Sequence, residues 1–365
     1  MNANEREWEP VVLMKSCTSR RSFLRTSLLG VAALGLQRWN VGAMALRPTP
    51  PSGASVVALT TGRQRADLTL RALAPFSDRI RRAIGDKRVI IKPNNVSIEN
   101  PLCATHAETL EGILEFLKSI DKAENMVIAE SAASGPTLDG FDNYGYTRLT
   151  ARYPVKLVDL DQEPFEAVHV FDERDFRPHP VRMSSPLLDP NSYVISAARM
   201  KTHDRVVATL SLKNIILGAP IKDLGFRWGR ESKAGTRNDK PIVHGSGFRG
   251  LNYNLFALAQ RMPPDLAVID GFEGMEGNGP VGGTPVDHRV CVASLDWLAA
   301  DRVAVELMGI DYARVGYLNY CGKAGLGQDD LTKIEVVGEP IARHIRTYKL
   351  HDNIEKQLVW MQPAA

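Results

Sequence analysis

The sequence predicts an α/β protein in which a mostly parallel sheet is covered by helices on both faces. Short apolar runs typical of strands alternate along the chain with segments whose apolar residues recur at helical spacing. This alternation favours parallel strands joined by helices that pack on the sheet. In such sheets ligands gather beyond the carboxyl ends of the strands, so a site is expected there.

The individual elements follow from these patterns. A helix is expected after the capping-box pattern Thr105-x-x-Glu108. Residues 165–190 are less regular and are predicted to contain a hairpin or an extension, and a subdomain is expected there or at 220–250. Within the latter, residues 222–240 are expected to form a mobile loop over the site. The other expected helices cover 67–84 and 296–308, and the expected strands cover 55–59, 88–91, 125–129, 155–158, 192–197, 266–269, 289–293 and 333–337.

The N-terminal 45 residues have the features of a cleaved export signal. Ser19-Arg-Arg-Ser-Phe-Leu-Arg25 resembles the twin-arginine translocation signal, and a short apolar segment and the small-x-small pattern Ala43-Met-Ala45 follow. We therefore expect the twin-arginine export machinery as a partner and a periplasmic or otherwise extracytoplasmic location. The expected organisation is a signal peptide (1–45), a linker (46–54), one α/β domain (55–340) and a C-terminal tail (341–365).

The charge of the chain argues against a nucleic-acid partner. The formal net charge of +3 belongs to the leader, which holds six basic and three acidic residues. The remainder is neutral, whereas nucleic-acid-binding domains normally show a basic footprint. No later segment reaches transmembrane length, so no stable membrane span is expected after cleavage.

The cysteines exclude one class of cofactor. Cys103, Cys291 and Cys321 remain after cleavage, and no Cys-x-x-Cys pair exists. A cysteine-ligated iron–sulfur cluster is therefore not expected. A divalent metal is left open, and the cofactor is otherwise unknown.

Polar residues follow several of the predicted strands. Because the carboxyl ends of parallel strands share one edge, we expect these residues to converge on a polar site. Lysine and asparagine there would bind a carboxylate or phosphate, and histidine would serve as general acid or base. The predicted catalytic residues are Lys201, His203 and His244, and the predicted substrate-binding residues are Lys92, Asn94, Glu130, Lys213, Asn214 and Asn278. Asp301 is expected on a helix surface.

A stretch of glycines and carboxylates, residues 270–285, follows the strand at 266–269. Glycine at this density allows close approach of backbone and ligand, so an irregular loop is expected to form one wall of the site. Its carboxylates Asp270, Glu273 and Glu276 are the predicted ligands of a divalent cation. A plain surface connection is the alternative.

These motifs together resemble the domain-of-unknown-function family 362. The resemblance covers roughly residues 55 to 340 and implies an α/β fold with a polar cleft, but no settled reaction. The fold is also similar to the N-terminal part of nickel-dependent lactate racemases, an analogy that carries no function. Some members carry a ferredoxin-type module, whose cysteines are missing here. The matching motifs are Lys92-Pro-Asn94, the Glu130 strand end, Lys201-Thr-His203, Lys213-Asn-x-x-x-Gly218, the stretch 270–280, Ala300-Asp-Arg-Val303, Met308-Gly309 and Val336-Val-Gly-Glu339.

The leading functional hypothesis is an enzyme that acts on a small anionic metabolite in a Lys/His/Glu-lined cleft. Racemisation, hydrolysis and redox chemistry all remain open. The alternatives are a periplasmic ligand- or cofactor-binding protein without catalysis and an accessory protein for metal-centre maturation.

Changing Arg20 and Arg21 together to lysine should prevent export, because the arginine pair is the recognised part of the signal. Fractionation of expressing cells checks this, and Arg25→Lys is the matched control because lysine is usual at that position. Extracytoplasmic accumulation of the double variant would refute a twin-arginine signal.

Overall fold

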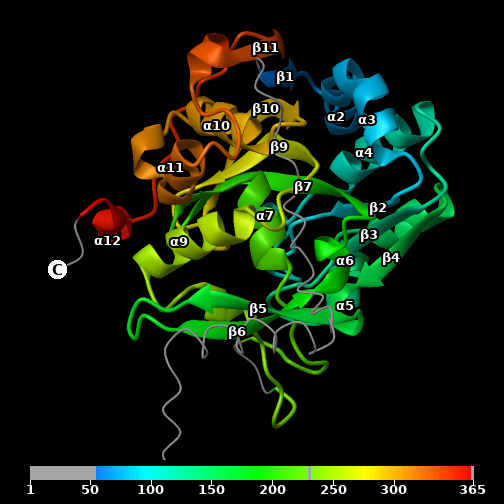
Figure 1. Ribbon diagram of the computed structural model, residues 1–365. Coiled ribbons are helices and arrows are strands. Elements are labelled where there is room, and N and C mark those ends of the chain that lie inside the picture. The colour runs from blue at the N-terminus through cyan, green and yellow to red at the C-terminus, as the bar shows by residue number, and fades with distance from the viewer. Residues whose placement is uncertain (1–54, 229–231, 363–365) are drawn as a thin grey trace, which may run out of the picture. The chain divides into compact units, whose positions relative to one another are not determined.

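A sheet of nine strands forms the centre of the protein (Figure 1). The computed structural model describes residues 55–228 and 232–362, so the expected leader and linker lie outside the described residues. The strand order is β11-β1-β10-β9-β7-β2-β3-β4, and the short strand β8 pairs with β7. A separate two-stranded sheet consists of β5 and β6.

The strands are β1 (Ser55–Thr61), β2 (Arg88–Lys92), β3 (Met126–Glu130), β4 (Val155–Asp159), β5 (Phe165–Phe171), β6 (Pro178–Ser184), β7 (Ser192–His203), β8 (Val207–Thr209), β9 (Leu266–Glu276), β10 (Thr284–Ser294) and β11 (Ile334–Gly338). The helices are α2 (Arg65–Leu73), α3 (Ser77–Ile84), α4 (Ala107–Ser119), α5 (Thr137–Asn143), α6 (Ser185–Leu188), α7 (Ser211–Gly218), α8 (Lys240–Val243), α9 (Phe248–Ala259), α10 (Trp297–Leu307), α11 (Gly316–Lys323) and α12 (Ile354–Gln357).

The prediction of a mostly parallel sheet is confirmed. Strands β4, β3, β2, β7 and β9 run parallel in succession, and β11 is parallel to β1. Within the nine-stranded sheet, as far as the structure describes it, antiparallel pairing is confined to β10 with its neighbours β1 and β9 and to β8 with β7. The carboxyl ends of β2, β3 and β7 therefore lie at one edge, as the sequence predicts.

Helices cover both faces of the sheet, which explains why its central strands are apolar on both sides. Helices α2, α3, α4 and α5 pack on one face, and α7, α9, α10 and α11 pack on the other (Figure 1). Each face has its own cluster of buried apolar residues. All twelve residues of β7, in the middle of the sheet, are buried.

Two strands extend further than their apolar runs indicate. Strand β7 continues past residue 197 to His203, because β8 pairs with its end. Strand β9 continues through the glycine-rich stretch to Glu276 and pairs with β10. The expectation of an irregular loop directly after residue 269 is therefore wrong, and only residues 277–283 connect the two strands.

The glycines of this hairpin permit close packing. A Cβ atom at Gly274 would overlap the buried ring of Tyr348, and one at Gly279 would overlap the carbonyl oxygen of Thr202. At Gly283 it would overlap the carbonyl oxygen of Glu276. Much of the glycine content is thus explained by contacts within the protein, since only glycine lets backbones approach so closely.

Other differences are local. The expected helix at 67–84 is divided into α2 and α3 by the turn at Ala74–Phe76, which contains a proline. The irregular region at 165–190 contains the hairpin β5–β6, as one of the expected possibilities. The segment after residue 340 packs on the domain, since Tyr348 and Gln357 are buried.

Gly283→Ala should lower the free energy of unfolding by about 1–3 kcal/mol, because the added methyl group forces the hairpin connection away from Glu276. The adjacent Gly282→Ala is the matched control, since its Cβ would lie 3.3 Å from the nearest neighbour outside its flanking residues, the carbonyl oxygen of Asn278. Urea denaturation measures both. Equal effects would show that the close approach at Gly283 does not constrain the hairpin.

Candidate functional site

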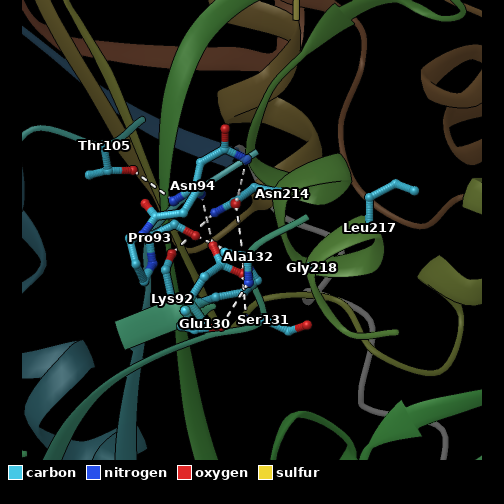
Figure 2. A network of polar contacts seen from close by, with 12 residues as sticks. Lys92, Pro93, Asn94, Thr105, Glu130, Ser131, Ala132, Asn214, Leu217 and Gly218 are labelled. Carbon is cyan, nitrogen blue, oxygen red and sulfur yellow. Dashed lines mark hydrogen bonds and ion pairs between the residues drawn. The ribbon is translucent and has the colours of Figure 1, made fainter. Parts of the chain in front are cut away.

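A buried ion pair lies where β2 and β3 end (Figure 2). The Nζ atom of Lys92 is 2.8 Å from Oε1 of Glu130, and both side chains are buried. Lys92 also donates to the carbonyl oxygen of Pro93 at 2.8 Å and to Oδ1 of Asn214 at 3.2 Å. Three acceptors therefore match the three N–H bonds of its ammonium group.

The carboxylate of Glu130 also has several hydrogen-bond donors around it. Its carboxylate accepts the backbone N–H groups of Asn95 and Ser131, each at 2.9 Å, besides the ammonium of Lys92. Burial lowers the pKa of Lys92, whereas the charge of Glu130 and its hydrogen bond raise it. The charge of Lys92 is therefore maintained by its partner Glu130 against the cost of burial.

Two asparagines, Asn94 and Asn214 (Figure 2), connect this pair to a second buried lysine, Lys201. Asn214 accepts from Nδ2 of Asn94 at 3.0 Å and donates to Oγ of Ser196 at 3.1 Å. The Oδ1 atom of Asn94 in turn accepts from Nζ of Lys201 at 2.6 Å, and Lys201 also donates to the carbonyl oxygen of Cys103 at 2.7 Å. Burial lowers the pKa of Lys201 to about 8.

Helix α7 is fixed against this network at both ends. At its C-terminus, Gly218 lies against Lys92, and a Cβ atom there would overlap the lysine side chain. At its N-terminus, Asp301 of α10 accepts the backbone N–H groups of Ser211 at 2.8 Å and Leu212 at 3.2 Å. Sequence reasoning placed Asp301 on a helix surface, but it is fully buried, and burial raises its pKa to about 8.

A second group of residues adjoins the network, and we call it the cationic cluster: Lys213, Arg205, His203 and His244. The charges of Lys213 and Arg205 lower the pKa of both histidines, and the nearby carboxylate of Asp204 opposes the lowering of the pKa of Lys213. Lys213 is only 4% exposed, yet within the described ranges its ammonium group has no hydrogen bond or ion pair. Burial, followed by the charge of Lys201, lowers its pKa to about 7.

Arg205 is the other cation of the cluster. In the described part of the chain its guanidinium group has only one recorded contact, with the ring of Phe248 at 5.9 Å. Sequence reasoning missed Arg205, although it lies two residues after the Lys-x-His pattern. The cluster therefore presents two cationic side chains whose donors remain available.

The two histidines have different surroundings. Nδ1 of His203 lies 3.0 Å from the backbone N–H of Arg205 and 3.1 Å from Oδ1 of Asp204. Nδ1 of His244 lies 3.1 Å from the carbonyl oxygen of Lys240, so its proton lies on Nδ1 and Nε2 is an acceptor. Burial lowers the pKa of His203 well below its usual range and that of His244 to about 4, so both rings are neutral near pH 7.

The turn that carries His203 is held by the C-terminal segment. Gln357 of α12 donates to the carbonyl oxygen of His203 at 2.9 Å and accepts the backbone N–H of Val207 at 2.7 Å. Val207 has a φ of 68°, which is strained for a β-branched residue. This pairing stabilises the turn, and no local sequence signal could have identified Gln357 as its partner.

The predicted metal ligands are not brought together. Asp270 is buried and accepts from Thr109 at 2.8 Å, Glu273 pairs with Arg199 at 2.9 Å, and Glu276 accepts the backbone N–H of Lys349 at 2.8 Å. Among the described residues no group of three or more potential His, Cys, Asp or Glu ligands could hold a metal ion.

Asn278 also lies apart from the network. It is exposed and exchanges hydrogen bonds with Asp352 of the C-terminal segment, at 2.8 and 3.1 Å. Its position at the hairpin connection therefore serves contacts with that segment. The other predicted substrate-binding residues and the three predicted catalytic residues lie in or beside the polar network.

The fold and this site define an α/β protein with a buried, lysine-rich polar centre at the carboxyl ends of parallel strands. The chain belongs to the family described as "Domain of unknown function (DUF362)", whose model matches residues 89–306. The matched segment contains every member of the network and of the cationic cluster.

One curated relative is a thylakoid-associated protein of Synechocystis sp. It is 25% identical over 230 residues, which cover 62% of this chain and 65% of the relative. The alignment therefore spans less than two thirds of the relative's length. Within the described residues, no helix is long and apolar enough to cross a membrane.

Replacing only one partner of the Lys92–Glu130 ion pair should strongly destabilise the folded protein. Lys92→Met and Glu130→Gln should each lower the free energy of unfolding by about 3–5 kcal/mol, because each leaves a buried polar group without its partner. The double variant should lose less than the sum of the two by about 2 kcal/mol or more. Urea denaturation of the four proteins checks this.

Arg81→Met is the matched control, since it breaks an exposed ion pair with Asp121 and should cost less than about 1 kcal/mol. Additive losses at Lys92 and Glu130 would contradict an energetic coupling between them.

Proposed function

We propose that this protein is an enzyme that acts on a small anionic metabolite bound at the cationic cluster. The observation that supports this most is the buried ammonium group of Lys213, which has no acceptor among the described residues. A buried charged group without a partner is costly, and an anionic ligand would supply the missing acceptor. Arg205 adds a positive charge near the same two histidines, His203 and His244.

The paired lysines have a different role in this proposal. All three donors of Lys92 are directed at protein acceptors, and Asn94 and Asn214 are committed to the same network. These residues, with Glu130 and Lys201, position α7 and the end of β7. The anion is therefore assigned to Lys213 and Arg205 and not to Lys92 and Asn94.

His244 favours catalysis over binding alone. Near pH 7 the neutral ring of His244 offers Nε2 as a proton acceptor, which is the function that a general base requires. Lys213, with a pKa of about 7, also exchanges a proton readily at neutral pH. A ligand carrier would need the cations but not a ring that can accept a proton.

Export by the twin-arginine route belongs to the same proposal. The signal lies in residues 1–45, which are outside the described residues. A metabolite-binding site that is complete within one folded domain is compatible with a route that moves folded proteins.

Lys213→Met should weaken anion binding and raise stability. At Lys213 the folded-state pKa of about 7 lies below the usual 10.5, so the folded protein binds fewer protons than the unfolded chain between these values. This unfavourable contribution is fully present below pH 7 and vanishes as the pH approaches 10.5. The variant should therefore be more stable at pH 7 by about 1–3 kcal/mol, and the difference should shrink as the pH rises.

Mass spectrometry of small molecules released from the natively purified protein, with metal analysis, would identify the ligand. Calorimetry with that ligand should show a loss of about tenfold or more for Lys213→Met and for Arg205→Met. Lys323→Met, at an exposed lysine, is the matched control and should bind normally. Unchanged binding by both cluster variants would contradict the assignment of the site.

A further inference from the structure

A pocket lies between the β5–β6 hairpin and helix α9 (Figure 1), on residues that belong neither to the polar network nor to the cationic cluster. Its volume of about 260 Å³ is smaller than the roughly 300–1,000 Å³ of pockets that take drug-sized ligands, so a small molecule fits it. Its walls are mostly apolar, and within the described part of the chain no lysine or arginine lines it. The pocket is therefore unsuited to an anion and open to a ligand of another kind.

Three aromatic residues line this pocket, and we call them the ring cluster: Phe171, Phe176 and Tyr253. The ring centroid of Phe171 lies 5.5 Å from that of Phe176 and 5.6 Å from that of Tyr253, and the ring planes meet at 63° and 68°. Rings inclined to one another in this way form the walls of a concave space, whereas coplanar rings would form a flat patch. Such walls attract a cation, because the face of an aromatic ring is electron-rich.

The rings are held in place by a buried side chain of α9. Asn254, the neighbour of Tyr253, accepts the backbone N–H of Phe171 at 2.7 Å and donates to its carbonyl oxygen, also at 2.7 Å. The same amide donates to the carbonyl oxygen of Val243 at 3.0 Å. The end of β5 and helix α9 are thereby joined, so the ring cluster is preorganised for a ligand.

Phe176 contributes little to the stability of the fold. Its φ of 55° lies in the left-handed region, which a bulky side chain rarely adopts, and the residue is 73% exposed. Little burial therefore offsets the strained backbone, and glycine or asparagine would suit this position better. Backbone strain at an exposed aromatic residue beside a pocket indicates that the ring serves a ligand.

The turn that carries Phe176 has an excess of negative charge. Residues 172–177 have the sequence Asp-Glu-Arg-Asp-Phe-Arg, with three carboxylates against two guanidinium groups. The electron-rich rings and this charge both favour a positively charged ligand. An uncharged apolar group would gain from burial but from neither of these features.

We propose that the ring cluster binds the trimethylammonium group of a quaternary ammonium compound. This cation has no N–H donors, so it enters an apolar pocket without leaving hydrogen bonds unmade. A primary ammonium group has three donors and would need acceptors that the rings do not supply. The site is separate from the proposed anion site and does not depend on it. Because Lys213 does not line the pocket, Lys213→Met should bind the cation as the wild type does.

Titration of the full-length protein with choline, followed by NMR spectroscopy, tests the proposal. Dimethylbutanol, the neutral carbon analogue of choline, is the control ligand because it has the same shape without the charge. Choline should bind more tightly than the alcohol by about tenfold or more, since only the cation interacts with the ring faces. Equal or tighter binding of the alcohol would show a merely apolar pocket and would overturn the proposal.

Variants of the ring cluster separate binding from folding. Phe176→Leu and Tyr253→Leu should each weaken choline binding by about fivefold and change binding of the alcohol much less, because leucine is apolar but has no electron-rich face. Phe165→Leu is the matched control, since Phe165 lies on the same hairpin, is 51% exposed and does not line the pocket. Phe176→Asn should also weaken choline binding and yet keep or raise the urea midpoint, because asparagine tolerates the left-handed backbone. Unchanged choline binding in all three pocket variants would overturn the proposal.

Vesicles distinguish a free solute from a lipid headgroup as the source of the cation. Phosphatidylcholine carries the same trimethylammonium group as choline, and phosphatidylglycerol vesicles are the control. Sedimentation with phosphatidylcholine alone, reversed by choline and lost in Phe176→Leu, would assign the site to a lipid headgroup. Choline binding without sedimentation would assign it to a free solute. Equal sedimentation with both kinds of vesicle and no binding of choline would refute a quaternary ammonium site.

Discussion

The ion pair between Lys92 and Glu130 is the constraint on which the arrangement of the site depends. A lysine and a glutamate cannot both be buried at adjacent strand ends unless every donor and acceptor is matched. Here Asn214, Pro93 and two backbone N–H groups complete the matching. Because one of these partners comes from α7, the pair fixes that helix to the edge of the sheet. Gly218 is required at the same place, since any larger residue would occupy the space of the lysine side chain.

The buried lysines show how the protein separates structure from reactivity. Lys92 is paired with a carboxylate and stabilises the fold. Lys213 lies five residues before Gly218, the glycine that contacts Lys92, and has no acceptor in the described part of the chain. Helix α7 therefore carries both Gly218, which packs against the fully hydrogen-bonded Lys92, and Lys213, whose ammonium group has no acceptor among the described residues. Residues held in an unfavourable state are typical of functional sites, where some stability is given up for chemistry. The strained backbone at Val207 lies in the neighbouring turn and is stabilised from a distance by Gln357.

The glycine-rich stretch illustrates how one pattern supports two interpretations. Glycine allows close approach, but the sequence does not say whether a ligand or another part of the protein approaches. The structure brings Tyr348, the carbonyl oxygen of Thr202 and the hairpin's own backbone against these glycines. The carboxylates of the stretch are separately engaged by Thr109, Arg199 and the backbone of Lys349. A wall of ligand-binding carboxylates is therefore replaced by a hairpin that packs on the end of β7.

The sequence by itself determined the class of fold, the positions of its main strands along the chain and the convergence of Lys92, Glu130 and Lys201 at one edge. These features follow from local periodicity and from the rule that parallel strands end together. Only the tertiary structure decided which buried polar groups have a hydrogen-bond or ion-pair partner and which do not. Asp301 and Gln357 are distant in sequence from the start of α7 and the turn after His203, to which they are hydrogen-bonded. The difference between Lys92 and Lys213 depends on whether an acceptor from another element lies within hydrogen-bonding distance of the ammonium group. Such pairing is a property of three-dimensional packing, so the spacing of residues along the chain does not reveal it.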